Sequence, residues 1–438
     1  MASEKTSIYQ VFLRNFTREG TFQAALPYLE TIKAMGFEWV YLTPLHPIGK
    51  KARKGTLGSP YAIQNYREIN PELGTLADFR RFVKHAHDLG LKVMIDVVYN
   101  HTAPDAVLAQ AHPEWYLRDS KGNFARKFDD WSDVIDFDFS SSPALWEELV
   151  DTLIQWRDEG VDGFRCDVAS LVPLEFWNYA RTKVNGVKGD GKETYPVVWL
   201  AEQVHPGFLL HVREKGYRCH SGPELHQAFD LTYDYDGFER LEAYWAGKKT
   251  LEFFVDYLYT QQTTYPEGTT KVRFLENHDQ KRAAWRFTDL DQLRQWTVFY
   301  QLLSGVTFVY MGQEYAIGST PSLFEKSSLE DEPKNTSFAS WFCQCFSLTQ
   351  MIKAQAGKFS IKLLRQGVVW IERSGVSRYV ALLNLENKRG EVELPFPLQG
   401  RDCFTDRTVS LSGCVEIPSE PFVVEMRENV TPTIKADK

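Results

Sequence analysis

The sequence predicts an α/β fold, a (β/α)8 TIM barrel with a short inserted lobe after strand 3 and a C-terminal antiparallel β-sandwich domain. Three observations predict it. Eight apolar runs rich in β-branched and aromatic residues recur along the chain, segments with helical periodicity lie between them, and short alternating strands follow after about residue 358. Strands that alternate with helices pair in parallel, and eight such strands close a barrel.

The predicted barrel strands share an internal polarity. Most of them begin with apolar residues and finish with Asn, His, Asp, Glu or Gln, which is typical of strands whose carboxyl ends form one active face. The predicted strands cover residues 8–16, 37–45, 91–101, 163–168, 197–203, 228–236, 271–279 and 305–315.

Helices are predicted between these strands at residues 76–90, 144–160 and 289–305, each ending at a glycine, as helix C-termini prefer. The catalytic barrel is expected to span residues 1–357, with the inserted lobe at 102–143. The C-terminal β-sandwich is expected at 358–428, and a charged tail at 429–438.

The composition excludes several classes of function. A net charge of -8 and a pI near 5.8, without a long Lys/Arg run, predict binding to neither nucleic acid nor an anionic membrane. The N-terminus lacks the pattern of a secretory signal, and no run approaches the roughly 20 apolar residues of a spanning helix. A cytoplasmic location is therefore expected, with a removed signal left open. Nothing in the sequence indicates an oligomeric state.

Cysteine spacing and a glycine-rich segment give two further exclusions. Cysteines at 166, 219, 343, 345, 403 and 414 show no C-x-x-C pair, so free thiols are expected, although Cys403 and Cys414 could flank a hairpin. "GVKGDGKET" at 186–194 nearly spells a phosphate-binding loop. However, Glu193 replaces the Ser or Thr that would ligate Mg²⁺, and the segment precedes a strand, so we interpret it as a polar loop.

Three carboxylates stand at the ends of predicted strands. In "GFRCDV", Arg165 and Asp167 share one face of a strand, and the neighbouring Arg should keep the carboxylate ionised. Glu202 ends the next strand beside apolar residues that can raise its pKa, and Asp279 ends a later one. Each alone has an ordinary structural explanation, an ion pair or a capping residue, but together they predict one acidic rim.

Paired carboxyl groups are the minimal equipment for cleaving a glycosidic bond. His101, His278 and Arg165 add donors for sugar hydroxyls. The 14% aromatic content supplies flat rings that can stack on sugars, or simply an aromatic-rich core. The sequence therefore predicts a sugar-cleaving site.

Four motifs at these strand ends resemble those of the α-amylase family, glycoside hydrolase family 13: "DVVYNH" (96–101), "GFRCDV" (163–168), "WLAEQ" (199–203) and "FLENHD" (274–279). The resemblance covers nearly the whole chain and implies that Asp167 is the nucleophile, Glu202 the acid/base and Asp279 a transition-state stabiliser. It also implies a substrate-binding set at the reacting sugar: Tyr61, Asp96, His101, Arg165 and His278.

The chain departs from the family pattern at two places. Ala62 follows Tyr61 where the family usually has Asp, and Ser170 and Leu171 replace a Lys-His pair typical of the α-amylases proper. The second departure removes a His whose carbonyl often binds the family's calcium. Asn100 and Asp136 still resemble calcium ligands, so either a structural Ca²⁺ or plain hydrogen bonds are expected there. The chemistry itself requires no cofactor.

The function expected from the resemblance is retaining hydrolysis of α-1,4-glucans such as starch, or of maltooligosaccharides, through a covalent glycosyl-enzyme intermediate. A transglycosylase (glucanotransferase) or an α-glucoside isomerase using the same intermediate is an alternative, because they differ in how water is excluded. A non-catalytic carbohydrate-binding protein on the same fold is the alternative from another class. Such relatives typically lose carboxylates or gain a membrane segment, and this chain shows neither change.

Overall fold

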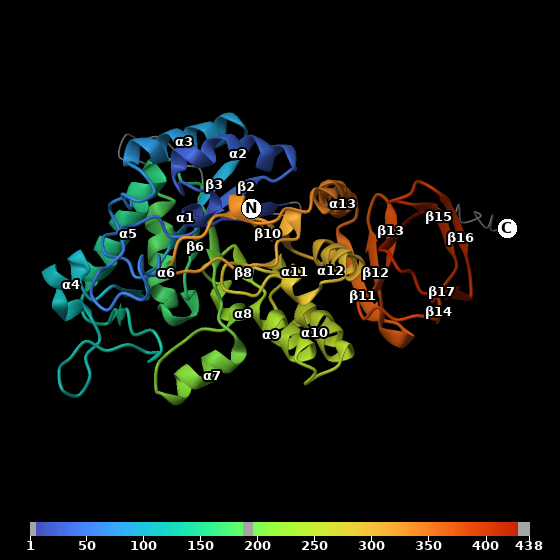
Figure 1. Cartoon of the computed structure of the whole chain (residues 1–438). Coiled ribbons are helices and arrows are strands. Elements are labelled where there is room, and N and C mark those ends of the chain that lie inside the picture. Colours follow the sequence, from blue (N-terminus) through green and yellow to red (C-terminus); the bar gives the residue numbers. More distant parts are fainter. Residues whose placement is uncertain (1–5, 187–195, 428–438) are drawn as a thin grey trace, which may run out of the picture.

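The computed structural model describes residues 6–186 and 196–427. Within these ranges, eight parallel strands close into a barrel in which each strand pairs with its neighbours in chain order (Figure 1). The fold class predicted from the sequence is confirmed. The barrel strands are β1 Ser7–Val11, β2 Trp39–Leu42, β3 Lys92–Val97, β6 Gly163–Cys166, β7 Val198–Ala201, β8 Leu231–Tyr233, β9 Thr270–Phe274 and β10 Val306–Tyr310.

Each barrel strand is shorter than the run that predicted it. β9, for example, ends at Phe274, so Asn277 to Asp279 lie in the loop that follows the strand. The hydrogen-bonded strand covers the first part of this run, and the polar residues that close the run continue beyond it at the carboxyl end. Because parallel strands have their carboxyl ends at one face of the barrel, the polar ends still gather there.

Helices surround the barrel, and several begin at side-chain caps. Thr75 and Asp78 form a capping box at the start of α3, and Ser142 caps α5. The longer helices are α2 Phe22–Ala34, α3 Leu76–Asp88, α5 Pro143–Asp158, α6 Leu174–Val184, α7 Pro206–Glu214, α9 Tyr235–Trp245, α10 Leu251–Thr264, α12 Leu290–Leu302 and α13 Thr336–Gln355. The short helices are α1 Leu13–Phe16, α4 Val107–Ala111, α8 Gly222–Leu225 and α11 Ala283–Arg286.

The long connection between β3 and α5 carries α4, a 3-10 turn at Pro113–Trp115 and a small ribbon of β4 His101–Thr102 with β5 Ile135–Asp136. The ribbon pairs His101 with Asp136, which joins the far part of this connection to the carboxyl end of β3. The predicted lobe at 102–143 falls on this connection.

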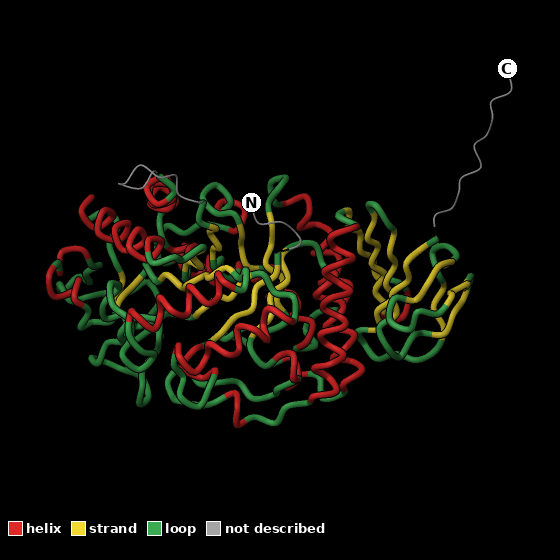
Figure 2. Tube along the Cα trace, turned by 90° about the horizontal axis from the view of Figure 1, so that it is seen from above, coloured by secondary structure: helices red, strands yellow, loops and turns green. Residues whose placement is uncertain are grey.

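The C-terminal part consists of antiparallel sheets with the strand order β11-β12-β13-β18-β15-β16 and β14-β17. Figure 2 shows these strands gathered at one end of the molecule, beside the helices. Both faces of the larger sheet are buried: Val369 and Ile371 of β12 join the core shared with the barrel, whereas Val368 and Trp370 face a second core. The strands are β11 Lys358–Leu363, β12 Val368–Ser374, β13 Arg378–Asn384, β14 Glu391–Glu393, β15 Leu398–Asp402, β16 Thr408–Leu411, β17 Cys414–Glu416 and β18 Phe422–Met426.

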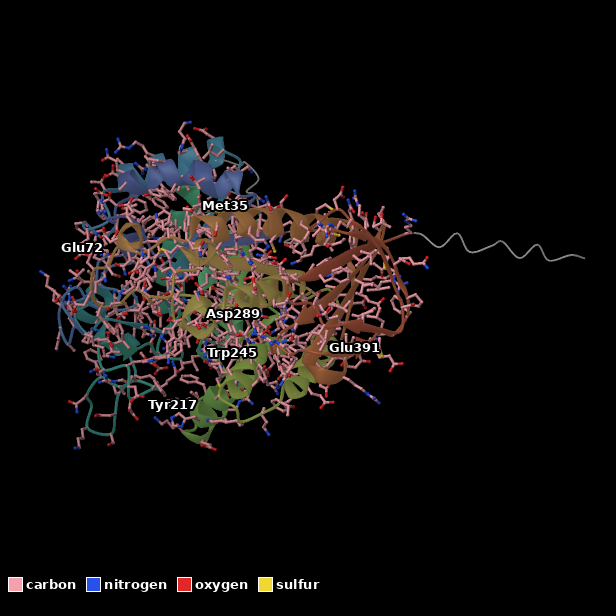
Figure 3. The ribbon with its side chains drawn as sticks, turned by 45° about the vertical axis from the view of Figure 1, so that its right-hand side comes forward. Met35, Glu72, Tyr217, Trp245, Asp289 and Glu391 are labelled. Carbon is pink, nitrogen blue, oxygen red and sulfur yellow. The ribbon has the colours of Figure 1, made fainter. Side chains whose placement is uncertain are left out.

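In Figure 3, Tyr217, which follows α7, lies at the lower edge of the molecule, and Glu391, at the start of β14, lies to its right in the C-terminal part. In the part of the chain that the structure describes, no helix is long and apolar enough to cross a membrane. The six cysteines all lie in described residues and are free; Cys403 follows β15 and Cys414 begins β17, so they do not flank one hairpin. Most of the glycine-rich segment at 186–194, and the tail at 429–438, lie outside the described residues.

Candidate active site

A single buried guanidinium holds three carboxylates at the centre of the barrel. Nη1 of Arg165 lies 2.8 Å from Oδ1 of Asp96 and 2.8 Å from Oδ1 of Asp167, and Nη2 lies 2.8 Å from Oε2 of Glu202. Asp96, Arg165 and Glu202 come from or follow β3, β6 and β7, which are neighbours in the barrel. The strand order therefore brings together residues that are far apart in the sequence.

The turn after β6 directs the backbone toward Glu202. Val168 adopts a left-handed conformation, with φ 41°, which is rare for a β-branched residue. In this conformation its backbone N–H donates to Oε2 of Glu202 at 2.8 Å. Non-glycine residues hold such strained conformations where the surroundings enforce them, often at functional sites. The strained turn thus supplies Glu202 with a fixed donor.

The pKa values of Asp167 and Glu202 are both raised above their ordinary values. Burial is the main cause for each carboxyl. The charge of Glu202 raises the pKa of Asp167 further, while Arg165 lowers both pKa values. Arg165, the neighbour that the sequence identified, lowers the pKa of Asp167 as expected, but burial and the charge of Glu202 act in the opposite direction and outweigh it. One guanidinium cannot offset the burial and mutual repulsion of the surrounding carboxylates.

Asp279 is held by the loop that follows β9. Its backbone N–H donates to Oδ1 of Asn277 at 3.0 Å, and Nδ2 of Asn277 donates to the Tyr235 hydroxyl at 2.9 Å. Nε2 of His278 lies 3.2 Å from Oδ2 of Asp279. These bonds present the carboxylate at the barrel mouth, where it is the most exposed of the three predicted catalytic residues.

Tyr61 and His278 form the floor beside these carboxylates. Their rings stack with centroids 5.4 Å apart and an interplanar angle of 14°. The Tyr61 hydroxyl donates to Oδ2 of Asp96 at 2.9 Å. Nε2 of Gln10, on β1, contacts Nδ1 of His278 at 2.8 Å. Burial lowers the pKa of both His101 and His278, so both rings are neutral at pH 7.

A cavity of about 370 Å³ opens above this floor. Of the predicted residues, Asp167, Glu202, Asp279, Tyr61 and His101 line it. Asp96, Arg165 and His278 lie directly beneath, where they hold the lining residues through the bonds described above. The structure brings all eight predicted residues together: five line the cavity, and three support its wall without forming it.

Sequence reasoning missed much of the cavity wall. Val168, Gln203 and Tyr235 could have been found, because they stand at the ends of predicted strands, whereas the others lie in segments that carry no strand signal. The additional lining residues are Lys54, Ser59, Trp131, Asp133, Val134, Val168, Gln203, Val204, His205, Phe208, Tyr235, Gln280, Leu323 and Phe324.

The two predicted calcium ligands do lie together, but a lysine occupies the space between them. Nζ of Lys127 is 2.7 Å from Oδ1 of Asn100 and 3.5 Å from Oδ2 of Asp136. Calcium requires six to eight oxygen ligands, and an ammonium group repels a divalent cation. Only Oδ1 of Asp136 is left without a hydrogen-bond partner among the described residues of this group. The residues present do not fit Ca²⁺.

Comparisons with known proteins match most of the chain to one family model and to solved structures. The family model "Alpha amylase, catalytic domain" matches residues 10–341. The crystal structure of an alpha-amylase from Lactobacillus plantarum is 38% identical, with a TM-score of 0.89, over 97% of this chain and 99% of that one. A noncanonic maltogenic alpha-amylase from Thermotoga neapolitana is 34% identical, with a TM-score of 0.84, over the same shares.

Curated relatives match over a shorter stretch. An alpha-1,4-glucan:maltose-1-phosphate maltosyltransferase from Methylacidiphilum infernorum is 35% identical over 240 residues, which are 48% of this chain and 34% of the relative. The namesake from Myxococcus xanthus is 33% identical over 44% of this chain and 32% of its own length. The chain thus spans about a third of the length of these relatives.

Proposed function

Because the chain belongs to the α-amylase family, we propose that it is a retaining enzyme that cleaves the α-1,4 bonds of glucans or maltooligosaccharides. One observation carries the proposal. Asp167 and Glu202 are bound to the two terminal nitrogens of a single guanidinium and line the same cavity. Two carboxyls held so close to one reacting centre suit a double displacement, in which the first forms a covalent intermediate.

In the first step, a carboxylate oxygen of Asp167 attacks C1 of the bound sugar. The bond from C1 to the glycosidic oxygen breaks, and Glu202 gives its proton to that oxygen. In the second step, Glu202 takes a proton from water, whose oxygen attacks C1 and releases Asp167. Glu202 is then protonated again, so the residues return to their starting state without any cofactor.

The electrostatics of the pair support this division of labour. Two adjacent carboxyls with raised pKa values titrate as a unit and retain a proton at a pH where isolated carboxyls are ionised. We assign that proton to Oε1 of Glu202, because Oε2 already accepts from Val168 and Arg165. Asp167 then remains the anionic nucleophile. Asp279, which lines the same cavity, would bind sugar hydroxyls, and its negative charge would stabilise the positive charge that develops at C1 in the transition state.

Substrates with different leaving groups test the two roles separately. Asp167→Ala should abolish turnover of both maltoheptaose and α-maltosyl fluoride, because neither substrate can form the covalent intermediate without the Asp167 carboxylate. Glu202→Ala should lose maltoheptaose cleavage but keep much of its activity on the fluoride, whose leaving group needs no proton. Glu214→Gln, at the end of α7, is the matched carboxyl control and should behave as wild type. Full activity of Asp167→Ala on either substrate would overturn the proposal.

A second candidate function, glucan transfer, is favoured by the wall next to Glu202. Val168, Val204, Phe208 and Trp131 line the cavity there, and the rings of Trp131 and Phe208 stack with centroids 6.0 Å apart. Apolar rings bind the flat face of an acceptor sugar and displace water from the position it must take for hydrolysis. The relatives named as maltosyltransferases perform a transfer.

The product pattern from maltotriose discriminates hydrolysis from transfer. If transfer dominates, oligosaccharides longer than maltotriose should accumulate before new reducing ends rise. Phe208→Gln should then lower the ratio of transfer to hydrolysis severalfold, because water can enter the acceptor space. Reducing ends that appear in step with every bond broken, in the wild type and the variant alike, would exclude transfer.

The action on starch, the cytoplasmic location and the expected lack of nucleic-acid and membrane partners belong to the same proposal. The cavity and the -8 net charge suit an uncharged oligosaccharide. Fractionation of cells that express the full natural chain tests the location. Enzyme activity confined to the extracellular or membrane fraction would contradict it.

A further inference from the structure

Lys127 lies in the inserted lobe, yet its ammonium group reaches the carboxyl end of β3. Only 7% of the residue is exposed. Nζ lies 2.7 Å from Oδ1 of Asn100 and 3.5 Å from Oδ2 of Asp136, while the backbone N–H of Lys127 donates to the same Oδ2 at 3.0 Å. One side chain thus joins the lobe to the barrel, next to the β4–β5 pairing of His101 with Asp136.

The ammonium group determines the orientation of the Asn100 amide. Because –NH3⁺ only donates, the amide oxygen must face it, and Nδ2 of Asn100 then points to Nδ1 of His101 at 3.1 Å. Nδ1 of His101 accepts that bond, so the ring proton is carried by Nε2. Nε2 lies 4.0 Å from Oδ2 of Asp167, and His101 lines the cavity. A chain of fixed orientations therefore runs from Lys127 to the nucleophile proposed above.

We propose that Lys127 is the built-in cation of this junction, in place of the metal ion that the family resemblance implies, and that it positions His101 against Asp167. It supplies positive charge beside Asp136 and ties residues 100 and 136 together, as a divalent cation would. It also leaves too few oxygen atoms for Ca²⁺. The role in positioning rests on the proposed function; the role as the junction's cation does not.

The first experiment concerns the cation alone. The melting temperature and kcat of the wild type are measured in EDTA and in millimolar CaCl₂. Both should be the same in the two conditions. A melting temperature that falls in EDTA and recovers with Ca²⁺ would show a bound metal and overturn the proposal, whatever the enzyme's substrate is.

The second experiment removes the ammonium group. Lys127→Ala should lower kcat at least about tenfold, as the loss of a residue that orients a site residue commonly does. Propylammonium, which replaces the deleted atoms, should restore much of that loss. Lys215→Ala removes a lobe-contacting ion pair, that of Lys215 with Asp129 at 2.9 Å, and is the matched control with unchanged kcat. A kcat of Lys127→Ala within twofold of wild type would overturn the positioning role.

A third variant keeps the hydrogen bond from Lys127 and removes the hydrogen-bond donor to His101. Asn100→Asp can still accept from Lys127 but can no longer donate to His101, so the ring proton should move to Nδ1. Nitrogen-15 NMR of the His101 ring should report that exchange of tautomers, together with a lower kcat and a melting temperature near that of the wild type. An unchanged tautomer would contradict the chain of orientations, even if Lys127→Ala failed to fold.

Discussion

At the scale of single residues, the site is dominated by an imbalance of charge. Arg165, only 1% exposed, faces Asp96, Asp167 and Glu202, so three carboxylates share one guanidinium. Burial and repulsion raise the pKa values of the two carboxyls that line the cavity. Such an arrangement lowers the stability of the fold while it prepares one proton donor and one nucleophile.

Replacing Glu202 by Gln should therefore stabilise the protein at neutral pH. The pKa of Glu202 is raised in the folded protein, so the folded protein loses stability as the pH rises and this carboxyl ionises. The ionised form of Glu202 is therefore unfavourable at pH 7. Gln can accept the same bonds from Val168 and Arg165 without the charge. The gain in melting temperature over wild type should be present at pH 7 and should shrink as the pH falls toward 4.

Glu330 offers a control of opposite sign. Hydrogen bonds from the Tyr28 hydroxyl and the Arg18 backbone lower its pKa, so its charge stabilises the fold at neutral pH. Glu330→Gln should lower the melting temperature at pH 7 and lose that effect in acid. If Glu202→Gln were the less stable protein at pH 7, the electrostatic account of the site would be wrong.

At the scale of elements, the loops after the strands carry the special geometry. Val168 belongs to a small buried cluster with Leu171, Leu209, Val212 and Cys219, which holds its strained backbone in place. A left-handed conformation costs an L-residue about 1–2 kcal/mol that glycine does not lose. The packing of this cluster compensates for the strain.

This strain predicts unequal costs for two buried valines. Val168→Gly removes packing but relieves the strain, whereas Val172→Gly only removes packing, because Val172 is extended at φ -101°. The free energy of unfolding should fall by at least about 1 kcal/mol less in Val168→Gly than in Val172→Gly. Chemical denaturation measures both variants, and equal losses would show that the turn is not strained.

A buried network behind β7 fixes the residue next to Glu202. Nζ of Lys271 lies 3.0 Å from Oε1 of Gln203 and 3.0 Å from Oδ1 of Asp236, and the Tyr265 hydroxyl donates to Gln203 at 3.1 Å. Gln203 itself lines the cavity. The packing of β9 against α9 is thereby linked to the position of the acid/base residue.

Lys271→Met should leave Asp236 buried without its cation and cost about 3–5 kcal/mol of unfolding free energy. In the double variant with Asp236→Asn, the buried charge is gone. The unfolding free energy that the double variant loses should therefore be smaller than the sum of the losses of the two single variants, by more than about 1 kcal/mol. Additive losses in denaturant unfolding would mean that the pair does not interact.

The sequence predicted the elements better than their ends. Alternating strand and helix patterns placed every barrel strand, but the polar residues of runs such as 271–279 extend beyond the hydrogen-bonded part. β15, with its polar sequence "LQGRD", gave no strand signal. Lys127 was missed for another reason: it stands in a loop without a strand or helix pattern, and only the folded lobe brings its side chain between Asn100 and Asp136.

At the scale of the whole molecule, the barrel and the C-terminal sheet share one hydrophobic core. Ile371, Ala381 and Leu383 of the sheet belong to the same buried cluster as the barrel residues. Nε and Nη2 of Arg373 donate to the Leu302 carbonyl at 3.0 and 2.9 Å, which joins β12 to the end of α12. Figure 1 shows the sheet packed beside α12 and α13.

The shared core predicts that the chain unfolds as one unit. Calorimetry should show a single transition, and a chain truncated after residue 357 should aggregate, because the apolar surface that Ile371 and its neighbours cover would be exposed. Two separate transitions, or a stable truncated barrel, would show that the two parts fold independently.

The central claim is that Asp167 and Glu202 act in turn at one anomeric carbon of an α-glucoside. Proton NMR during the first minutes of maltoheptaose cleavage tests it most directly, because the two displacements restore the original configuration. The newly released end should appear first as the α-anomer and only later equilibrate with the β-anomer. Initial release of the β-anomer would require a single displacement by water and would contradict the account.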